Sequence, residues 1–243
     1  MKIFRLHINL YLKDKIEMFL ANSLLSKKIL GNKRSIVFVR GITKKLIEHY
    51  GCDEKYPTDI NSGNLGLGFI HYALILNCKP KRILCVGSQK GFIPSICSLA
   101  CQENNFGCVD FIDVGYEFEN LNYWPGISWW KMVDPNKHFS FLDINKYMTT
   151  YLTTTEQFVN KYQYKYQYIY INGDRSDKNV RSDFELFWPK LEKQGLMILH
   201  GFKKVDSNSR LPWFNPQKLF QNMEKKNKMT IILSHSSLCI LQK

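Results

Sequence analysis

Three features are missing from this sequence, and each absence excludes a class of protein. No run of 18 or more apolar residues occurs, so no transmembrane helix is predicted. The stretch 3–12 carries polar residues and lacks a small-residue cleavage site, so it does not resemble a secretory signal. The seven cysteines include no Cys-x-x-Cys pair, which argues against a zinc site or a disulfide framework. We therefore expect a cytoplasmic protein whose cysteines are reduced.

The composition fits one sizeable α/β domain. Of the 243 residues, 44% are hydrophobic and 14% are aromatic, which is enough to fill a single core. The formal net charge is +13, but residues 51–202 hold 15 Lys and Arg against 16 Asp and Glu, so the excess lies in the two ends. A solvated basic surface is the default interpretation, and contact with an anionic surface is the minority one.

The apolar pattern predicts alternating strands and helices after a helical lead-in. The predicted strands are 82–86, 108–113, 139–142, 166–171, 195–200, 229–234 and 237–242. The predicted helices are 13–30, 35–50, 63–77, 91–103, 145–160, 178–192 and 215–227. So short a turn separates the last two strands that they must be antiparallel.

A glycine turn follows the predicted strand 82–86 and opens a helix. Gly87 lets the backbone turn tightly, and Gly91 lets the helix come close to a ligand, as in sites that bind nucleotide-like cofactors. The strand 108–113 ends in Asp113, 22 residues beyond Gly91. A carboxylate at this position accepts hydrogen bonds from ribose hydroxyls, although Asp also commonly starts turns. Spacing and strand context favour the ribose role.

Over residues 60–243, the order of elements resembles the class I S-adenosylmethionine-dependent methyltransferases. The most specific segments are Ile171-Asn-Gly-Asp-Arg, then Asp183-Phe-Glu-Leu-Phe-Trp-Pro-Lys-Leu, then a strand that ends in His200-Gly. These segments are similar to small-molecule O-methyltransferases of the catechol and sugar types. There the fourth strand ends in Ile-Asp-Gly-Asp-His, the next helix carries an acid, and the fifth strand ends in His-Asp.

The resemblance implies a fold, a cofactor and a reaction. The fold is Rossmann-like α/β, with a seven-stranded, mostly parallel sheet, an antiparallel last strand, helices on both faces and an N-terminal helical extension. We accordingly expect an extension over residues 1–60 and a methyltransferase domain over residues 61–243. The cofactor is S-adenosyl-L-methionine, and the methyl acceptor is a hydroxyl of a small molecule or glycan. A homodimer and contact of the basic ends with an anionic surface are compatible with this reading.

The resemblance also assigns residues to the cofactor. Gly68, 19 residues before Gly87, falls where an upstream helix meets the methionine part of the cofactor. Asp143 falls near the adenine amino group, and it could cap the next helix as well. The residues expected to bind the cofactor are Gly68, Gly87, Ser88, Gly91, Asp113, Asp143, Ile144 and Asn172.

Three positions depart from the family pattern. Cys85, Asn172 and Gly201 stand where the family carries acids. In the catechol-like and sugar enzymes the last two acids help to bind magnesium, a cation that prefers anionic oxygen ligands. We therefore expect no metal site. The same losses leave open a methyltransferase fold that binds cofactor or a partner without turnover.

Without a metal, a side chain must accept the proton of the acceptor hydroxyl. His200 is the expected general base, because its unperturbed pKa lies near neutrality, and Asp174 is expected to orient it or the acceptor. The alternatives are a histidine satisfied at a strand end and an aspartate that caps the helix near residue 178.

Other readings remain open in the sequence. The tryptophans Trp124, Trp129 and Trp130 either line an acceptor pocket or form a packing element. A nucleic-acid methyltransferase is less favoured, because Asn172-Gly-Asp-Arg differs from the Asn-Pro-Pro-Tyr type of motif that grips a base. An NAD-dependent oxidoreductase would require Gly-x-Gly-x-x-Gly, which the glycine turn lacks.

Overall fold

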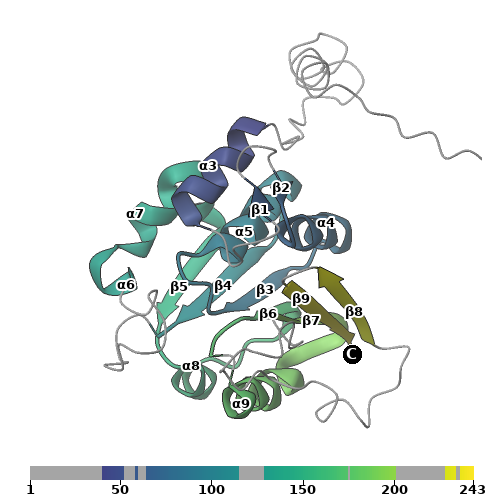
Figure 1. Ribbon diagram of the computed structural model, residues 1–243. Coiled ribbons are helices and arrows are strands. Elements are labelled where there is room, and N and C mark those ends of the chain that lie inside the picture. Colours follow the sequence, from purple (N-terminus) through teal and green to yellow (C-terminus); the bar gives the residue numbers. More distant parts are fainter. Residues whose placement is uncertain are drawn as a thin grey trace, which may run out of the picture.

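The computed structural model describes residues 40–51, 58–59, 64–114, 129–174, 176–200, 228–233 and 236–243. Figure 1 shows a twisted central sheet with helices on both of its faces. In the described part of the chain, no helix combines the length and the apolar character that a membrane crossing requires.

The central sheet has seven strands in the order β5-β4-β3-β6-β7-β9-β8. The five strands from β5 to β7 are parallel, and β9 is antiparallel to both of its neighbours. The strands are β3 (Arg82–Val86), β4 (Cys108–Asp113), β5 (Met148–Leu152), β6 (Tyr166–Ile171), β7 (Leu191–His200), β8 (Lys228–Leu233) and β9 (Ser236–Gln242). A separate small sheet pairs β1 (Thr58–Asp59) with β2 (Asn64–Leu65). The predicted sheet, mostly parallel with an antiparallel last strand, is confirmed.

Side chains alternate along each strand, so the sheet has two apolar faces. A different set of helices covers each face. In β6, Tyr168 and Tyr170 belong to the apolar cluster of one face, and Ile169 and Ile171 to that of the other. The first face is covered by α3 (Arg40–Tyr50), α4 (Gly68–Cys78) and α5 (Phe92–Asn104). The second is covered by α8 (Thr155–Lys161) and α9 (Asp177–Phe187), the latter followed by η3 (Trp188–Lys190). The prediction of helices on both faces is confirmed.

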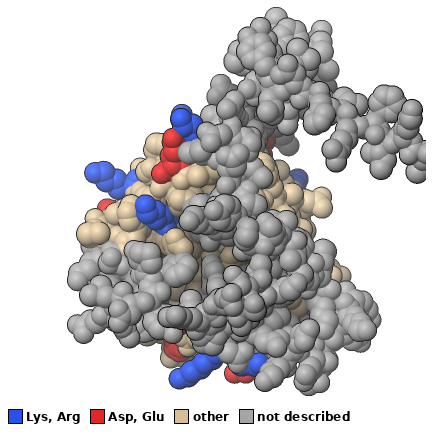
Figure 2. Space-filling view, viewed as in Figure 1, with Lys and Arg blue, Asp and Glu red and all other residues tan. Residues whose placement is uncertain are grey.

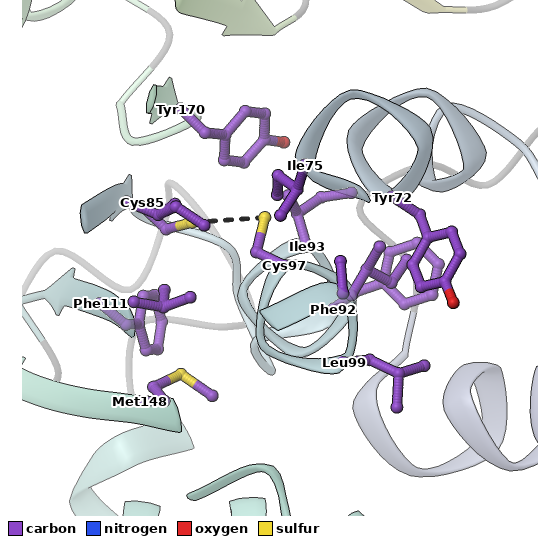
Figure 3. Close-up of a cluster of buried hydrophobic side chains, with 14 of the residues drawn as sticks. Tyr72, Ile75, Cys85, Phe92, Ile93, Cys97, Leu99, Phe111, Met148 and Tyr170 are labelled. Atoms are coloured by element: carbon purple, nitrogen blue, oxygen red, sulfur yellow. Dashed lines mark hydrogen bonds between the residues drawn. The ribbon is translucent and has the colours of Figure 1, made fainter. Parts of the chain in front are cut away.

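Figure 3 shows part of the cluster on the α4 and α5 face. Cys85 of β3 and Cys97 of α5 are fully buried there, and the Cys85 thiol donates a weak hydrogen bond to the Cys97 sulfur at 3.9 Å. Cys85 occupies the position where the resembling family has an acid. In this chain the side chain at that position packs into the apolar core.

The segment between β4 and β5 differs from the prediction. A strand is expected over 139–142, but α6 (Trp129–Met132) and α7 (Pro135–Phe139) are followed by the 3-10 turns η1 (Ser140–Leu142) and η2 (Ile144–Tyr147). In a strand, Phe139 and Phe141 would lie on the same face. Here Phe139 is buried and Phe141 is 47% exposed, as expected of a helical turn, in which residues two apart point to different sides. The predicted helix 145–160 is wrong over its first part, because it spans η2 and β5 before it reaches α8 (Thr155–Lys161). The strand β5 is rich in β-branched and aromatic residues, which favour extended backbone.

The N-terminal part that the structure describes packs on the domain. Leu46 and Tyr50 of α3 are buried in the same cluster as Ile83 and Cys85 of β3. The predicted helices 13–30 and 215–227 and most of the two basic ends lie outside the described residues. On the face shown in Figure 2, the described Lys and Arg side chains form no continuous patch, and several of them lie beside Asp or Glu side chains.

Candidate functional site

The carboxyl ends of three neighbouring strands meet at one point of the sheet edge. The carbonyl of Val86, the last residue of β3, accepts a hydrogen bond at 2.8 Å from the backbone N–H of Asn172, which follows β6. The next residue, Gly87, donates its N–H to the carbonyl of Ile112 in β4 at 2.9 Å. The predicted site residues Gly87 and Asn172 are therefore neighbours beside the end of β4. Ligands bind open parallel sheets at edges of this kind.

Gly87 is required at this edge by two constraints. Its φ is 65°, in the left-handed region where a side chain is strained. A Cβ at this position would lie 2.6 Å from the carbonyl oxygen of Asn172 and 2.8 Å from the Cα of Gly173. Both contacts are with backbone, which cannot move aside as a flexible side chain does. The loop after β6 therefore closes directly over the glycine turn.

The turn continues into α5 through Ser88 and Gly91. The Ser88 side chain is buried, and its Oγ accepts a hydrogen bond at 3.3 Å from the N–H of Ile93 in the first turn of α5. Gly91 has a φ of 85°, and a Cβ there would lie 2.5 Å from the ring of Phe139 in α7. The space that Gly91 leaves is thus filled by an aromatic ring of this chain.

Asp113 lies at the same edge as the glycine turn. It is the last residue of β4 and follows Ile112, which pairs with Val86. Its carbonyl accepts a hydrogen bond at 2.9 Å from the N–H of Thr153, the residue after β5. The structure therefore places Gly87, Ser88, Asp113 and Asn172 at one edge of the sheet. The spacing of the sequence predicts this position for Asp113, and the family resemblance predicts it for Asn172.

Gly68 is the buried first residue of α4. A Cβ at this position would lie 2.5 Å from the Cδ1 atom of Ile96 in α5. The glycine lets the beginning of α4 pack directly on the helix that the glycine turn opens. This places α4 next to the candidate site, as expected of the upstream helix.

The structure does not bring Asp143 and Ile144 to this edge. Asp143 lies between η1 and η2, before the first residue of β5, and parallel strands have their amino ends at the opposite side of the sheet. Its side chain is 73% exposed and pairs with Lys146 at 3.7 Å, while Ile144 is buried in the core. The residues that follow β5 at the candidate edge are Thr153 and Thr154. The expected adenine role of Asp143 and Ile144 is therefore wrong, because the strand that positions this contact begins after them.

His200 and Asp174 lie at the carboxyl ends of two neighbouring strands, β7 and β6. His200 is the last residue of β7, is 8% exposed, and its ring packs edge-on against Tyr170 with ring centroids 6.2 Å apart. Asp174 is exposed, and its carboxylate accepts hydrogen bonds from the Ser176 N–H at 2.8 Å and from the Asn179 side chain at 2.7 Å. Asp174 thus fixes the start of α9, with Ser176 as the N-cap.

Sequence reasoning assigns no role to two buried ionisable residues beside this edge. His71 of α4 is fully buried, its Nδ1 lies 2.7 Å from the Tyr168 hydroxyl, and burial lowers the pKa of its imidazole to about 3. Asp183 of α9 is also buried, and burial raises the pKa of its carboxyl to about 7. The only sequence signals were the position of His71 three residues after Gly68 and the place of Asp183 in the motif after β6.

Of the tryptophans Trp124, Trp129 and Trp130, the last two fall in the described part of the chain, and both pack against other side chains. Trp130 is buried against Phe111 and Phe139, with ring centroids 5.5 Å apart in each case. The ammonium group of Lys90 lies 4.4 Å from the centroid of the Trp129 ring. Trp124 lies outside the described residues. The packing interpretation of this stretch fits Trp129 and Trp130.

Comparison with solved structures identifies the architecture. An O-methyltransferase from Bacillus cereus in complex with SAH is 13% identical, with a TM-score of 0.54 over 94% of this chain and 100% of that one. The O-methyltransferase TomG from Streptomyces achromogenes, in complex with SAM, is 8% identical, with a TM-score of 0.53 over 92% and 97% of the two chains. The fold is that of the O-methyltransferases.

The same architecture recurs in an SAH-bound methyltransferase from Podospora anserina, which is 14% identical with a TM-score of 0.51 over 99% of each chain. No family model matches the chain, and no curated protein matches it either. Among the described residues of this O-methyltransferase fold, no group of three or more His, Cys, Asp or Glu side chains is placed to hold a metal ion.

Proposed function

We propose that the protein is an S-adenosylmethionine-dependent methyltransferase that methylates a hydroxyl oxygen of a small molecule or glycan. The observation that carries the proposal is the edge where Gly87, Ser88, Asp113 and Asn172 lie together. This edge occurs in a fold shared with O-methyltransferases that were crystallised with SAM or SAH.

The residues at this edge fit the chemistry of the cofactor. The Asp113 carboxylate can accept hydrogen bonds from the two ribose hydroxyls. Gly87 keeps side-chain atoms away from the end of β3, and Gly68 would border the methionine end from α4. When bound, the cofactor supplies a methyl group on a positively charged sulfur. What remains for the chain is to hold the acceptor oxygen in line with that group and to take its proton.

In this proposal His200 accepts the proton, because it ends β7 at the candidate edge and histidine is the side chain that most often serves as a general base. Its contact with the Tyr170 ring restricts the orientation of the imidazole. Asp174 is committed to the start of α9, which makes it a residue that shapes the loop beside His200.

Replacing His200 with Ala should lower turnover by about 10²- to 10⁴-fold, the usual loss of a general base. Cofactor affinity should stay nearly unchanged, because the histidine acts on the acceptor. Turnover is measured with methyl-labelled cofactor on an acceptor found by screening phenols, catechols and sugars. Thermal unfolding of the variant serves as the control for folding. Full turnover by the variant would favour proximity alone, with the proton lost to water.

We further propose that the reaction needs no divalent metal, since Asn172 and Gly201 stand where the family supplies carboxylates. Activity should therefore survive a chelator. Assays with excess EDTA, followed by addition of magnesium, check this. A collapse of activity that only magnesium restores would contradict the proposal and would point to Asp174 as a ligand.

A second candidate function is binding of cofactor or a partner without turnover. The observation that favours it is the loss of acids at three positions, one of which, Cys85, packs into the core. Methylation of any acceptor in the screen would exclude this candidate. Cofactor binding without any methylated product would support it.

The deciding experiment for the proposed function is cofactor binding. Mass spectrometry of the purified protein should detect SAM or SAH carried from the cell, and calorimetry should show saturable binding of both. Failure of both measurements would refute the proposal.

We also propose a cytoplasmic location, because the six described cysteines are free thiols, as expected in a reducing compartment.

A further inference from the structure

Asp183 is a buried carboxyl directly beneath the loop that closes over the glycine turn. It lies on α9, on the face of the helix that meets the sheet, and it is 7% exposed. Its Oδ2 atom lies 3.5 Å from the position that a Cβ on Gly173 would take. Carboxyl groups are rarely buried unless they are paired, and perturbed carboxyl groups are enriched at functional sites.

The charged groups around Asp183 disfavour a negative charge on its carboxyl, whereas Thr155 favours one. Its side chain forms a hydrogen bond with Thr155, the first residue of α8. The charged groups that act on it are Glu156 of α8 and Asp174 of the loop after β6, and both are acidic. Burial, more than these charges, raises the pKa of the Asp183 carboxyl to about 7, against a smaller opposing effect of Thr155.

The proton on Asp183 decides whether its hydrogen bonds form a consistent chain. The Thr155 hydroxyl also lies 3.4 Å from a carboxylate oxygen of Glu156. With Asp183 protonated, its O–H donates to the Thr155 oxygen, and the Thr155 O–H is free to donate to Glu156. With Asp183 ionised, two carboxylates compete for one hydroxyl proton and repel each other.

Asp183 lies beside two segments that border the proposed cofactor site. The first is the loop Asn172–Asp174, which closes over Gly87 and leaves the Asp183 Oδ2 atom 3.5 Å from the position of a Cβ on Gly173. The second is the start of α8, where Thr154 is the N-cap and Thr153 donates its N–H to the carbonyl of Asp113. We propose that Asp183 is a positioning residue that holds these two segments together, and that ionisation of its carboxyl releases them and weakens cofactor binding.

This inference rests on the proposed function, and it makes a quantitative statement about it. A carboxyl with a pKa near 7 is about 90% protonated at pH 6 and about 10% at pH 8. If only the protonated form holds the site, the apparent affinity for SAH falls about tenfold between these values. The amino group of the ligand titrates in the same range, so the informative quantity is the difference between variants.

The test compares the wild type with Asp183→Asn, Asp183→Ala and the control Glu185→Gln, which neutralises an exposed acid on the same helix. An amide can donate to the Thr155 oxygen as the protonated acid does. By calorimetry, Asp183→Asn should bind SAH within about twofold of the wild type at pH 6 and lose the tenfold fall at pH 8. Asp183→Ala should bind more weakly at both pH values, and Glu185→Gln should follow the wild type.

Hydrogen exchange gives a second measurement that needs no cofactor. At pH 8 the amides of residues 172–176 should exchange faster in the wild type than in Asp183→Asn, and equally at pH 6. Equal exchange at both values, or a pH profile of SAH affinity that is the same in wild type and Asp183→Asn, would overturn the inference. If no variant binds SAH, the proposed function fails, and hydrogen exchange alone decides whether Asp183 holds the loop.

Discussion

Asp113 and Asp143 are both predicted to bind the cofactor, but they lie in different surroundings. Asp113 ends β4 beside the glycine turn, whereas Asp143 precedes β5 with 73% of its side chain exposed. The sequence predicts that Asp113 ends a strand beside the glycine turn, because that strand is short and clearly bounded. It does not predict the position of Asp143, because that depends on where the next strand begins. The buried states of His71 and Asp183 were not predictable either, since they follow from packing between distant segments.

Replacing Asp113 with Ala should weaken SAM binding by about 1–3 kcal/mol, the cost of leaving the ribose hydroxyls without their acceptor. Calorimetry measures the change. Asp143→Ala is the matched control, because it removes the same carboxylate from the opposite end of the sheet. Equal affinities for the two variants would remove Asp113 from the site.

At the scale of elements, three core strands were predicted with the bounds that the structure has, namely 82–86, 108–113 and 166–171. They are mostly apolar runs between turn residues, and such runs are typical of strands that are buried on both faces of a parallel sheet. The strand β5 was missed, because its threonines and tyrosine give no clear apolar period and the preceding Phe-Ser-Phe-Leu fits two periods. That one error also led to the prediction that Asp143 and Ile144 contact adenine, although they lie before β5.

Replacing Gly87 with Ala should destabilise the fold by about 2–4 kcal/mol, because left-handed strain and a backbone clash act together. Urea unfolding measures this loss. Gly173→Ala is the control, since its Cβ would meet only the Asp183 carboxylate at 3.5 Å and a Val86 methyl at 3.8 Å. The control should stay within about 1 kcal/mol of the wild type. Similar losses in both variants would mean that the loop yields to the added methyl group.

For the whole molecule, His71 and Asp183 give stability opposite pH slopes. Burial lowers the pKa of His71 from 6.5 to about 3, so the unfolded chain binds the extra proton between these values and stability rises with pH. Burial raises the pKa of Asp183 from 3.8 to about 7, so the folded chain binds the extra proton there and stability falls with pH. The two contributions offset each other between about pH 4 and pH 6.5.

Removing either group should expose the slope of the other. Relative to the wild type, Asp183→Asn should gain stability as pH rises from 4 to 6.5, and His71→Gln should lose it, each by up to about 1.4 kcal/mol per pH unit. Urea unfolding at pH 4, 5 and 6 measures both differences. A variant whose difference from the wild type is constant over this range would show that its residue does not titrate as described.

The strand order has a consequence for how the protein is made. β3 pairs with β4 through residues as near in sequence as Leu84 and Asp110, but with β6 through residues as far apart as Ile83 and Tyr168. Pairing across so long a loop carries the larger entropic cost and comes later in folding. Gly87 and Asn172 lie where the paired strands β3 and β6 end. A nascent chain that has emerged from the ribosome only as far as β5 would therefore lack the hydrogen bond between Asn172 and Val86, and its cofactor site would be incomplete until β6 is made.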